Sequence, residues 1–163
     1  MVNNEDISIR VALADDAETI HSLVRALAED IRASDQVKST VESFRTHGFS
    51  GSPSFESLIA ERDGKPVGLC IYFYTFSSWR GEVGLYVQDL YVSNDVRGTG
   101  LGKKLLAETV RRAAKKGATH LRLCVDHDNG PAQNFYSSIG MKRRDDDYVF
   151  EADGSAFTDI GEL

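Results

Sequence analysis

Hydrophobic positions at the start of the chain change from strand spacing to helical spacing, and each pattern predicts a different element. Residues 8–11 alternate as a short strand does. Asp15, with Glu18 three residues later, is typical of a helix start. The apolar positions that follow at helical spacing are Ile20, Leu23, Val24, Leu27, Ala28 and Ile31. We therefore expect an opening strand and an amphipathic helix.

The middle of the chain, after a short second helix that ends at Gly48, is rich in β-branched and aromatic residues. Residues 55–62 and 67–76 flank the dipeptide Asp63-Gly64, which predicts a hairpin. Residues 83–92 resume the same pattern. Three antiparallel strands are therefore expected here.

The second half of the chain alternates helical and strand patterns. Residues 100–116 predict a helix, residues 120–125 a strand, and Asn129 the start of a helix that Gly140 ends. One or two closing strands are expected around residues 148–150. This order predicts a single domain over residues 1–163 of class α/β (α+β). Its mixed, mostly antiparallel sheet would have six or seven strands, with helices on both faces.

Composition narrows the function classes. The formal net charge of −6 argues against a nucleic-acid binder and favours a cationic partner. No window approaches the roughly 20 apolar residues of a membrane span, and the first residues lack a signal-peptide pattern, so we expect a cytoplasmic protein. Cys70 and Cys124 lie in apolar runs and are expected to be buried, reduced thiols.

The most informative segment joins the third strand of the hairpin region to the following helix. It reads Arg97-Gly98-Thr99-Gly100-Leu101-Gly102-Lys103. Glycines let backbone N–H groups close on an anion, and the first turn of a helix leaves amides unpaired. The spacing fits neither the dinucleotide fingerprint nor the Walker loop. A tight turn without a ligand is the remaining alternative to a diphosphate site.

This segment resembles the Arg/Gln-x-x-Gly-x-Gly/Ala signature of the GNAT superfamily of acetyl-CoA-dependent N-acetyltransferases. Residues 129–140, Asn-Gly-Pro-Ala-Gln-Asn-Phe-Tyr-Ser-Ser-Ile-Gly, are similar to a second element of that family. Residues 47–49, 60–61, 68–79 and 85–92 resemble its diamine branch, the spermidine/spermine and thialysine acetyltransferases. The resemblance covers about residues 7–150 and implies the GNAT fold, acetyl-CoA as cosubstrate, a small cationic amine as acceptor, and a homodimer.

The same resemblance implies roles for individual residues. Backbone groups of Leu90, Tyr91 and Val92 would bind the pantetheine arm, and residues 97–103 would hold the diphosphate. The thioester end would be lined by Asn129, Pro131, Ala132, Asn134 and Tyr136. Tyr136 would act as the general acid that protonates the departing thiolate.

The acceptor side departs from the diamine branch. An alkylammonium must lose a proton before it attacks, and Gln88 stands where the branch has a glutamate base. Asp89, Asp126 or an acid of the first helix, Glu29 or Asp30, could take that role through water. Alternatively, the acceptor is something other than a polyamine. Independently of that choice, Asp89 could instead be a structural hydrogen-bond acceptor within the strand.

Other functions compete with small-amine acetylation. A protein or peptide acetyltransferase would need an open groove between residues 49–54 and the closing strands. A non-catalytic acyl-CoA-binding regulatory module would retain the glycine turn without turnover. His127 lies between two aspartates, but neither the calcium-loop nor the zinc spacing is present, so no metal is expected. Thiol release from acetyl-CoA with a panel of amines discriminates among these hypotheses.

Overall fold

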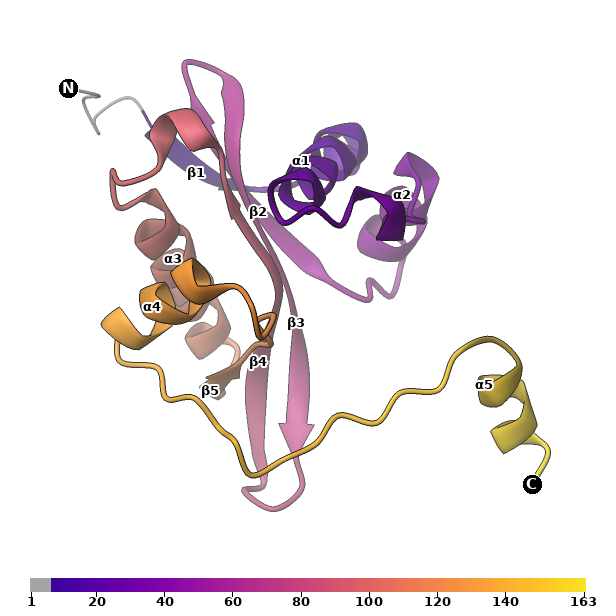
Figure 1. Cartoon of the computed structure of the whole chain (residues 1–163). Helices are drawn as coiled ribbons and strands as arrows, with labels where there is room; N and C mark the ends of the chain where they lie inside the picture. The colour runs from indigo at the N-terminus through magenta and orange to yellow at the C-terminus, as the bar shows by residue number, and fades with distance from the viewer. Residues whose placement is uncertain (1–6) are drawn as a thin grey trace. The chain divides into compact units, whose positions relative to one another are not determined.

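The computed structural model describes residues 7–163, which form two compact units. The first unit extends to Asp126 and contains the sheet, and the second is His127–Leu163. Figure 1 colours the chain from one terminus to the other. The prediction of a single domain stays a prediction.

The sheet of the first unit has five strands in the order β1-β2-β3-β4-β5. The strands are β1 (Ile7–Val11), β2 (Glu56–Arg62), β3 (Lys65–Ser77), β4 (Glu82–Val92) and β5 (Ala118–Arg122). Neighbours up to β4 pair antiparallel, whereas β4 and β5 pair parallel. The mixed, mostly antiparallel sheet is confirmed, but the expected six or seven strands are wrong for the part of the chain that is described.

The turn between β2 and β3 explains why these strands form the predicted hairpin. Asp63 and Gly64 have φ angles of 52° and 73°. Two successive positive φ angles match the right-handed twist of a hairpin, and Asp and Gly tolerate them better than other residues. The local sequence therefore determines this connection.

Helices cover both faces of the sheet, as predicted. Helices α1 (Ala17–Asp30) and α2 (Val41–Phe49) lie on one side, and α3 (Leu101–Lys115) lies on the other (Figure 1). The main core cluster joins α1 and α2 to one sheet face through buried residues that include Ile20, Leu23, Phe44, Ile59, Leu69, Ile71 and Tyr91. On the opposite face, the Leu105 side chain of α3 lies so near Gly68 that a Cβ there would be 2.9 Å away.

Helix α1 begins later than the capping pattern predicts. A 3-10 turn, η2 (Ala14–Asp16), precedes it, and Asp16 occupies the N-cap position. The Asp16 carboxylate accepts a hydrogen bond from the Leu13 amide at 2.7 Å and pairs with Arg10. Because this tertiary ion pair engages Asp16, the boundary shifts away from Asp15.

The second unit contains α4 (Gly130–Ser138) and α5 (Gly154–Gly161). Asn129 caps α4 as predicted, since its Oδ1 accepts from the Ala132 amide at 3.1 Å. Residues 141–153 form no strand, so the closing strands were predicted wrongly. Charges in this segment pair two residues apart, Arg143 with Asp145 and Arg144 with Asp146, as side chains on one side of an extended backbone can. Tyr148 and Phe150 are exposed rather than packed.

The two cysteines have different environments. Cys70 is buried in β3, and burial raises the pKa of its thiol to about 12, as expected for a reduced core residue. Cys124 is exposed, contrary to the prediction, because β5 ends at Arg122. Both are free thiols. Within residues 7–163, no helix combines the length and the apolar character needed to cross a bilayer.

Candidate active site

The glycine turn connects β4 to α3 through a short 3-10 turn, η4 (Asn94–Val96). Gly98 and Gly100 have φ angles of 77° and 84°, in the left-handed region that other residues rarely adopt. Val96 and Leu101, on either side, are almost fully buried and fasten the two ends of the turn to the core. The glycines therefore shape a backbone loop between two fixed points.

Most backbone amides of this turn have no hydrogen-bond acceptor within the described chain. The first helical bond of α3 runs from the Lys104 amide to the Gly100 carbonyl at 3.1 Å. Within residues 7–163, no hydrogen-bond acceptor is found for the amides of Gly98, Gly100, Leu101, Gly102 and Lys103. Unpaired amides at a helix N-terminus attract anions. The turn therefore has the donor set that a diphosphate requires.

Space and charge around the turn also suit an anionic ligand. A Cβ built on Gly98 or Gly100 would meet no atom within 4 Å, so the approach to the amides is open. Lys103 and Lys104 are exposed in the first turn of α3. No ion pair of either lysine is found among the residues that the structure describes. Their charges can compensate phosphates against the acidic surface of the protein.

The side chain of Arg97 contacts the protein itself. Its Nε donates to the Val92 carbonyl at 2.8 Å, its Nη2 pairs with Asp30, and its guanidinium lies 5.9 Å from the centre of the Tyr91 ring. The backbone amides are therefore better placed than this guanidinium to bind phosphates. The assignment of residues 97–103 to the diphosphate stays a prediction.

Strand β4 has one unpaired edge beside the turn. Parallel pairing with β5 extends only from Val83 to Tyr86. On that side, residues 87–92 have no strand partner in the described chain, while on the other side all of them except Gln88 pair with β3. An extended ligand with amide groups can bond to such an edge as an added strand would. This geometry supports the predicted role of Leu90, Tyr91 and Val92 in binding the pantetheine arm.

A bulge in β4 separates Gln88 from Asp89. The register passes from Ile71↔Asp89 to Tyr72↔Val87, so Gln88 has no partner in β3 and its side chain is exposed. Asp89 pairs with Ile71, a core residue on the α1 side, and cross-strand partners share a face of the sheet. Because of the bulge, the Gln88 side chain is exposed to solvent, whereas the adjacent Asp89 lies on the α1 face of the sheet.

The Asp89 carboxylate is largely removed from solvent. Burial raises the pKa of this carboxyl above its ordinary value. No hydrogen bond or ion pair to this carboxylate is found among residues 7–163. A desolvated acid without a partner is uncommon outside functional sites. The alternative that Asp89 is a structural hydrogen-bond acceptor in the strand therefore has no supporting contact.

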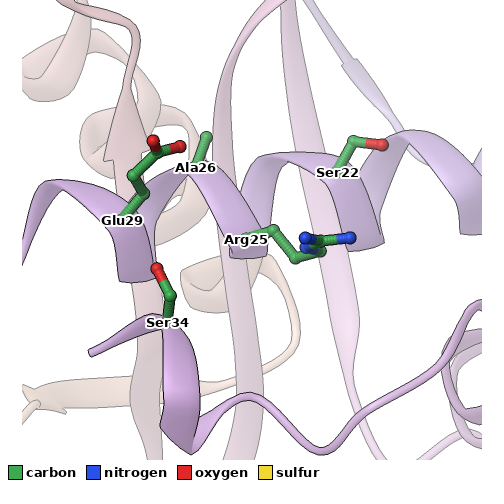
Figure 2. A pocket seen from close by; sticks show the side chains of 5 residues that line it. All are labelled: Ser22, Arg25, Ala26, Glu29 and Ser34. Atoms are coloured by element: carbon green, nitrogen blue, oxygen red, sulfur yellow. The ribbon is translucent and has the colours of Figure 1, made fainter. Parts of the chain in front are cut away.

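The remaining acids considered as bases lie in different places. Asp30 ends α1 and is paired with Arg97. Glu29 lies in a pocket of about 430 Å³ on α1 and the turn after it, whose other lining residues are Ser22, Arg25, Ala26 and Ser34 (Figure 2). Asp126 is exposed at the end of the first unit. Glu29 therefore shares its pocket with the oppositely charged Arg25.

The residues predicted to line the thioester end come from one helix of the second unit. Asn129 is the N-cap of α4, and the helix contains Pro131, Ala132, Asn134 and Tyr136. The Tyr136 ring packs edge-on against Phe135 with ring centroids 5.0 Å apart. The approach of Tyr136 to the glycine turn stays a prediction.

One supporting contact of the turn was missed by sequence reasoning. Asp95 in η4 forms an ion pair with Arg62 at the end of β2. The two residues are 33 positions apart, and neither belongs to a recognisable motif. Only the pairing of β2 with β3, and of β3 with β4, brings them together.

Comparison with known proteins agrees with this geometry. The model of the acetyltransferase (GNAT) family matches residues 20–141. The chain belongs to the GNAT family. The thialysine N-epsilon-acetyltransferase of Bos taurus is 35% identical over 144 residues, covering 83% of this chain and 84% of that protein. The spermidine/spermine N(1)-acetyltransferase-like protein 1 of Homo sapiens is 32% identical over 139 residues, 81% of this chain and 20% of that protein.

Solved structures resemble the fold as a whole. An integron cassette protein from the mobile metagenome of V. cholerae has a TM-score of 0.81 at 18% identity, covering 97% of this chain and 99% of that chain. As a GNAT member, the protein is an N-acetyltransferase, and membership implies acetyl-CoA as its cosubstrate. The unpaired amides of the turn, its open approach and the free edge of β4 fit that molecule.

Proposed function

We propose that this GNAT enzyme transfers the acetyl group of acetyl-CoA directly to a primary amine of a small cationic acceptor. The acceptor class is that of polyamines, diamines and thialysine-like amino acids. The observation that carries the proposal is the desolvated carboxylate of Asp89, for which the described chain provides no cationic partner. An alkylammonium would supply that partner.

The position of Asp89 suits this role. It directly precedes Leu90, the first residue of the β4 segment proposed to bind the pantetheine arm. A cation held at Asp89 would thus lie beside the strand along which the coenzyme extends. The names of the bovine and human relatives, which specify thialysine and spermidine/spermine, support a basic acceptor.

The reaction needs two proton movements. The ammonium first loses a proton, through water to Asp89, to become a nucleophile. The nitrogen then forms a bond to the acetyl carbonyl carbon while the carbon–sulfur bond breaks. Backbone N–H groups at the free edge of β4 would stabilise the negative charge on the carbonyl oxygen. The Tyr136 hydroxyl would protonate the thiolate and regain a proton from the acylated nitrogen.

Thiol release from acetyl-CoA tests the proposal against a panel of polyamines, thialysine and other lysine analogues, aminoglycosides and peptides. We expect turnover with the small basic amines. In Asp89→Asn, the KM for the amine should rise about 10- to 100-fold with little change in CoA affinity, because an amide cannot balance the ammonium. Asp63→Asn, which removes one negative charge at the exposed hairpin turn, is the matched control.

Three results would contradict the proposal or its assignment of Asp89. Turnover of peptides but not of small amines would favour a protein acetyltransferase. CoA binding without turnover of any tested amine would favour a non-catalytic regulatory module. A wild-type KM for the amine in Asp89→Asn would remove Asp89 from the acceptor site.

A further inference from the structure

The last residue of α1 contacts the glycine turn through both oxygens of its side chain. Asp30 Oδ2 pairs with Nη2 of Arg97, and Asp30 Oδ1 accepts from Asn94 Nδ2 at 3.4 Å. Its side chain is only 24% exposed. Asn94 is the first residue of η4, and Arg97 directly follows its last residue. One carboxylate therefore contacts both ends of the segment that leads into the glycine turn.

The Arg97 side chain also contacts the end of β4, the strand proposed to bind the pantetheine arm. Besides pairing with Asp30, the guanidinium donates to the carbonyl of Val92, the last residue of β4, and stacks on Tyr91. It therefore joins the end of α1 to the end of β4, immediately before Gly98. A change at Asp30 would alter the anchoring of the turn without removing any backbone amide.

The position of Asp30 on its helix gives a second reason to assign it a role. The C-terminal end of a helix carries a partial negative charge, so a carboxylate there is unfavourable unless a cation compensates it. Arg97 provides that compensation. A second ion pair, between Asp95 of η4 and Arg62 of β2, has the charges the other way round, with the acid on the turn and the base on the sheet. Two ion pairs of reversed polarity thus hold η4 from two elements.

We propose that Asp30 is a positioning residue that acts through Arg97 and Asn94 to hold residues 94–100 in the shape that receives the coenzyme diphosphate. The inference rests on the proposed coenzyme site at residues 97–103. It assigns Asp30 to the coenzyme side of the reaction, because both of its oxygens already bond to the turn. It links α1, whose residues Glu29 and Arg25 line the pocket of Figure 2, to the binding of the cosubstrate.

The test compares acetyl-CoA with S-acetylpantetheine, which has the same thioester but no diphosphate. In Asp30→Asn, the Kd for CoA and the KM for acetyl-CoA should rise about tenfold. The KM for S-acetylpantetheine and for the amine should change less than about twofold. The kcat at saturating acetyl-CoA should be unchanged. General loosening of the protein would affect both thioesters equally, so their ratio separates positioning from a merely structural role.

Matched variants complete the design. Asp35→Asn removes the same charge from the exposed turn after α1 and should behave as wild type. Arg97→Gln should share the selective defect, and the Asp30→Asn/Arg97→Gln double variant should be no worse than the weaker-binding single variant. If Asp30→Asn does not fold, Asn94→Ala removes one of the two contacts and should show a smaller selective loss.

The inference is overturned if the tested variants raise both thioester KM values alike, raise only the KM for the amine, or leave all three unchanged. Tighter CoA binding would also overturn it, because Asp30 would then be withholding Arg97 from the phosphates. Failure of the coenzyme site itself has a different signature, namely wild-type CoA affinity in Gly100→Val. A silent Asp30→Asn beside a defective Gly100→Val would reject only the role of Asp30.

Discussion

At the scale of single residues, backbone conformation shapes the glycine turn that is proposed to bind the coenzyme. Gly98 and Gly100 adopt left-handed φ angles and leave open space where a side chain would lie. Local sequence was enough to predict this turn, because alternate glycines between a strand and a helix indicate positions that need positive φ angles or a close approach of the backbone to a ligand. The desolvation of Asp89 could not be predicted in this way, since it depends on packing against the α1 side of the sheet.

The prediction at this scale concerns a side chain added at Gly100. It distinguishes the effect of filling the space beside the amides from the effect of straining the backbone. Gly100→Val should abolish measurable CoA binding, because a branched side chain would occupy the approach to the amides. Gly117→Val is a matched control, since Gly117 has a φ of 89° and also meets no neighbouring atom. Each variant should lose about 1–2 kcal/mol of unfolding free energy. Calorimetric titration with CoA and urea unfolding measure the two effects.

The result that would contradict this expectation is wild-type CoA affinity in Gly100→Val. The coenzyme would then bind in another part of the molecule. Equal loss of affinity in both variants would show that strain, rather than occupied space, is responsible.

At the scale of elements, an ion triad joins the edge strand β1 to α1 and β2. Arg10 of β1 donates to both oxygens of Asp16 at 2.7 and 2.8 Å, and to Glu61 of β2 at 2.7 Å. The hydrogen bond from Arg10 holds the pKa of the Asp16 carboxyl below its ordinary value. This triad engages Asp16, the N-cap residue of α1. Sequence patterns did not reveal it, because Glu61 is 51 positions from Arg10 and the spacing of Arg10 and Asp16 belongs to no recognisable motif.

The lowered pKa of Asp16 gives a pH-dependent prediction. Asp16→Asn should reduce the unfolding free energy by about 1–3 kcal/mol near neutral pH. A carboxyl with a depressed folded pKa binds more protons when unfolded, so its contribution is complete above the unfolded value, about 3.8, and is lost as the pH falls through the folded value. Urea unfolding between pH 7 and pH 3 should show the two proteins converging at the acid end.

The exposed neighbour Asp15 is a suitable control for that series. Asp15→Asn should change stability by less than about 0.5 kcal/mol at any pH. A deficit in Asp16→Asn that stays constant down to pH 3 would show that its ionised carboxylate is not the stabilising group.

At the scale of the whole molecule, the residues proposed for catalysis come from both units of the chain. The glycine turn, the free edge of β4 and Asp89 belong to the first unit, whereas the proposed general acid Tyr136 belongs to the second. The expected homodimer is a property of the same scale. It stays a prediction that sedimentation equilibrium can test.

The prediction at this scale concerns Tyr136. Tyr136→Phe should lower kcat by about 10²- to 10⁴-fold, the usual contribution of a general acid, with little change in CoA affinity. Tyr148→Phe is the control, because Tyr148 lies in the same unit and its side chain is 92% exposed. Steady-state kinetics with separate CoA titrations check both variants. An unchanged kcat in Tyr136→Phe would exclude the acid role.

The sequence by itself determined the features that depend on neighbouring residues. These are the order of the elements up to α4, the hairpin turn at Asp63-Gly64, the cap at Asn129 and the glycine turn, because turn and cap chemistry acts over a few positions. Tertiary structure alone decided the ion pair of Asp30 with Arg97, the desolvation of Asp89 and the exposure of Cys124. Charge pairing and burial depend on which distant elements meet. For the same reason, residues 148–150 have a strand-like pattern without forming a strand, since a strand also needs a partner.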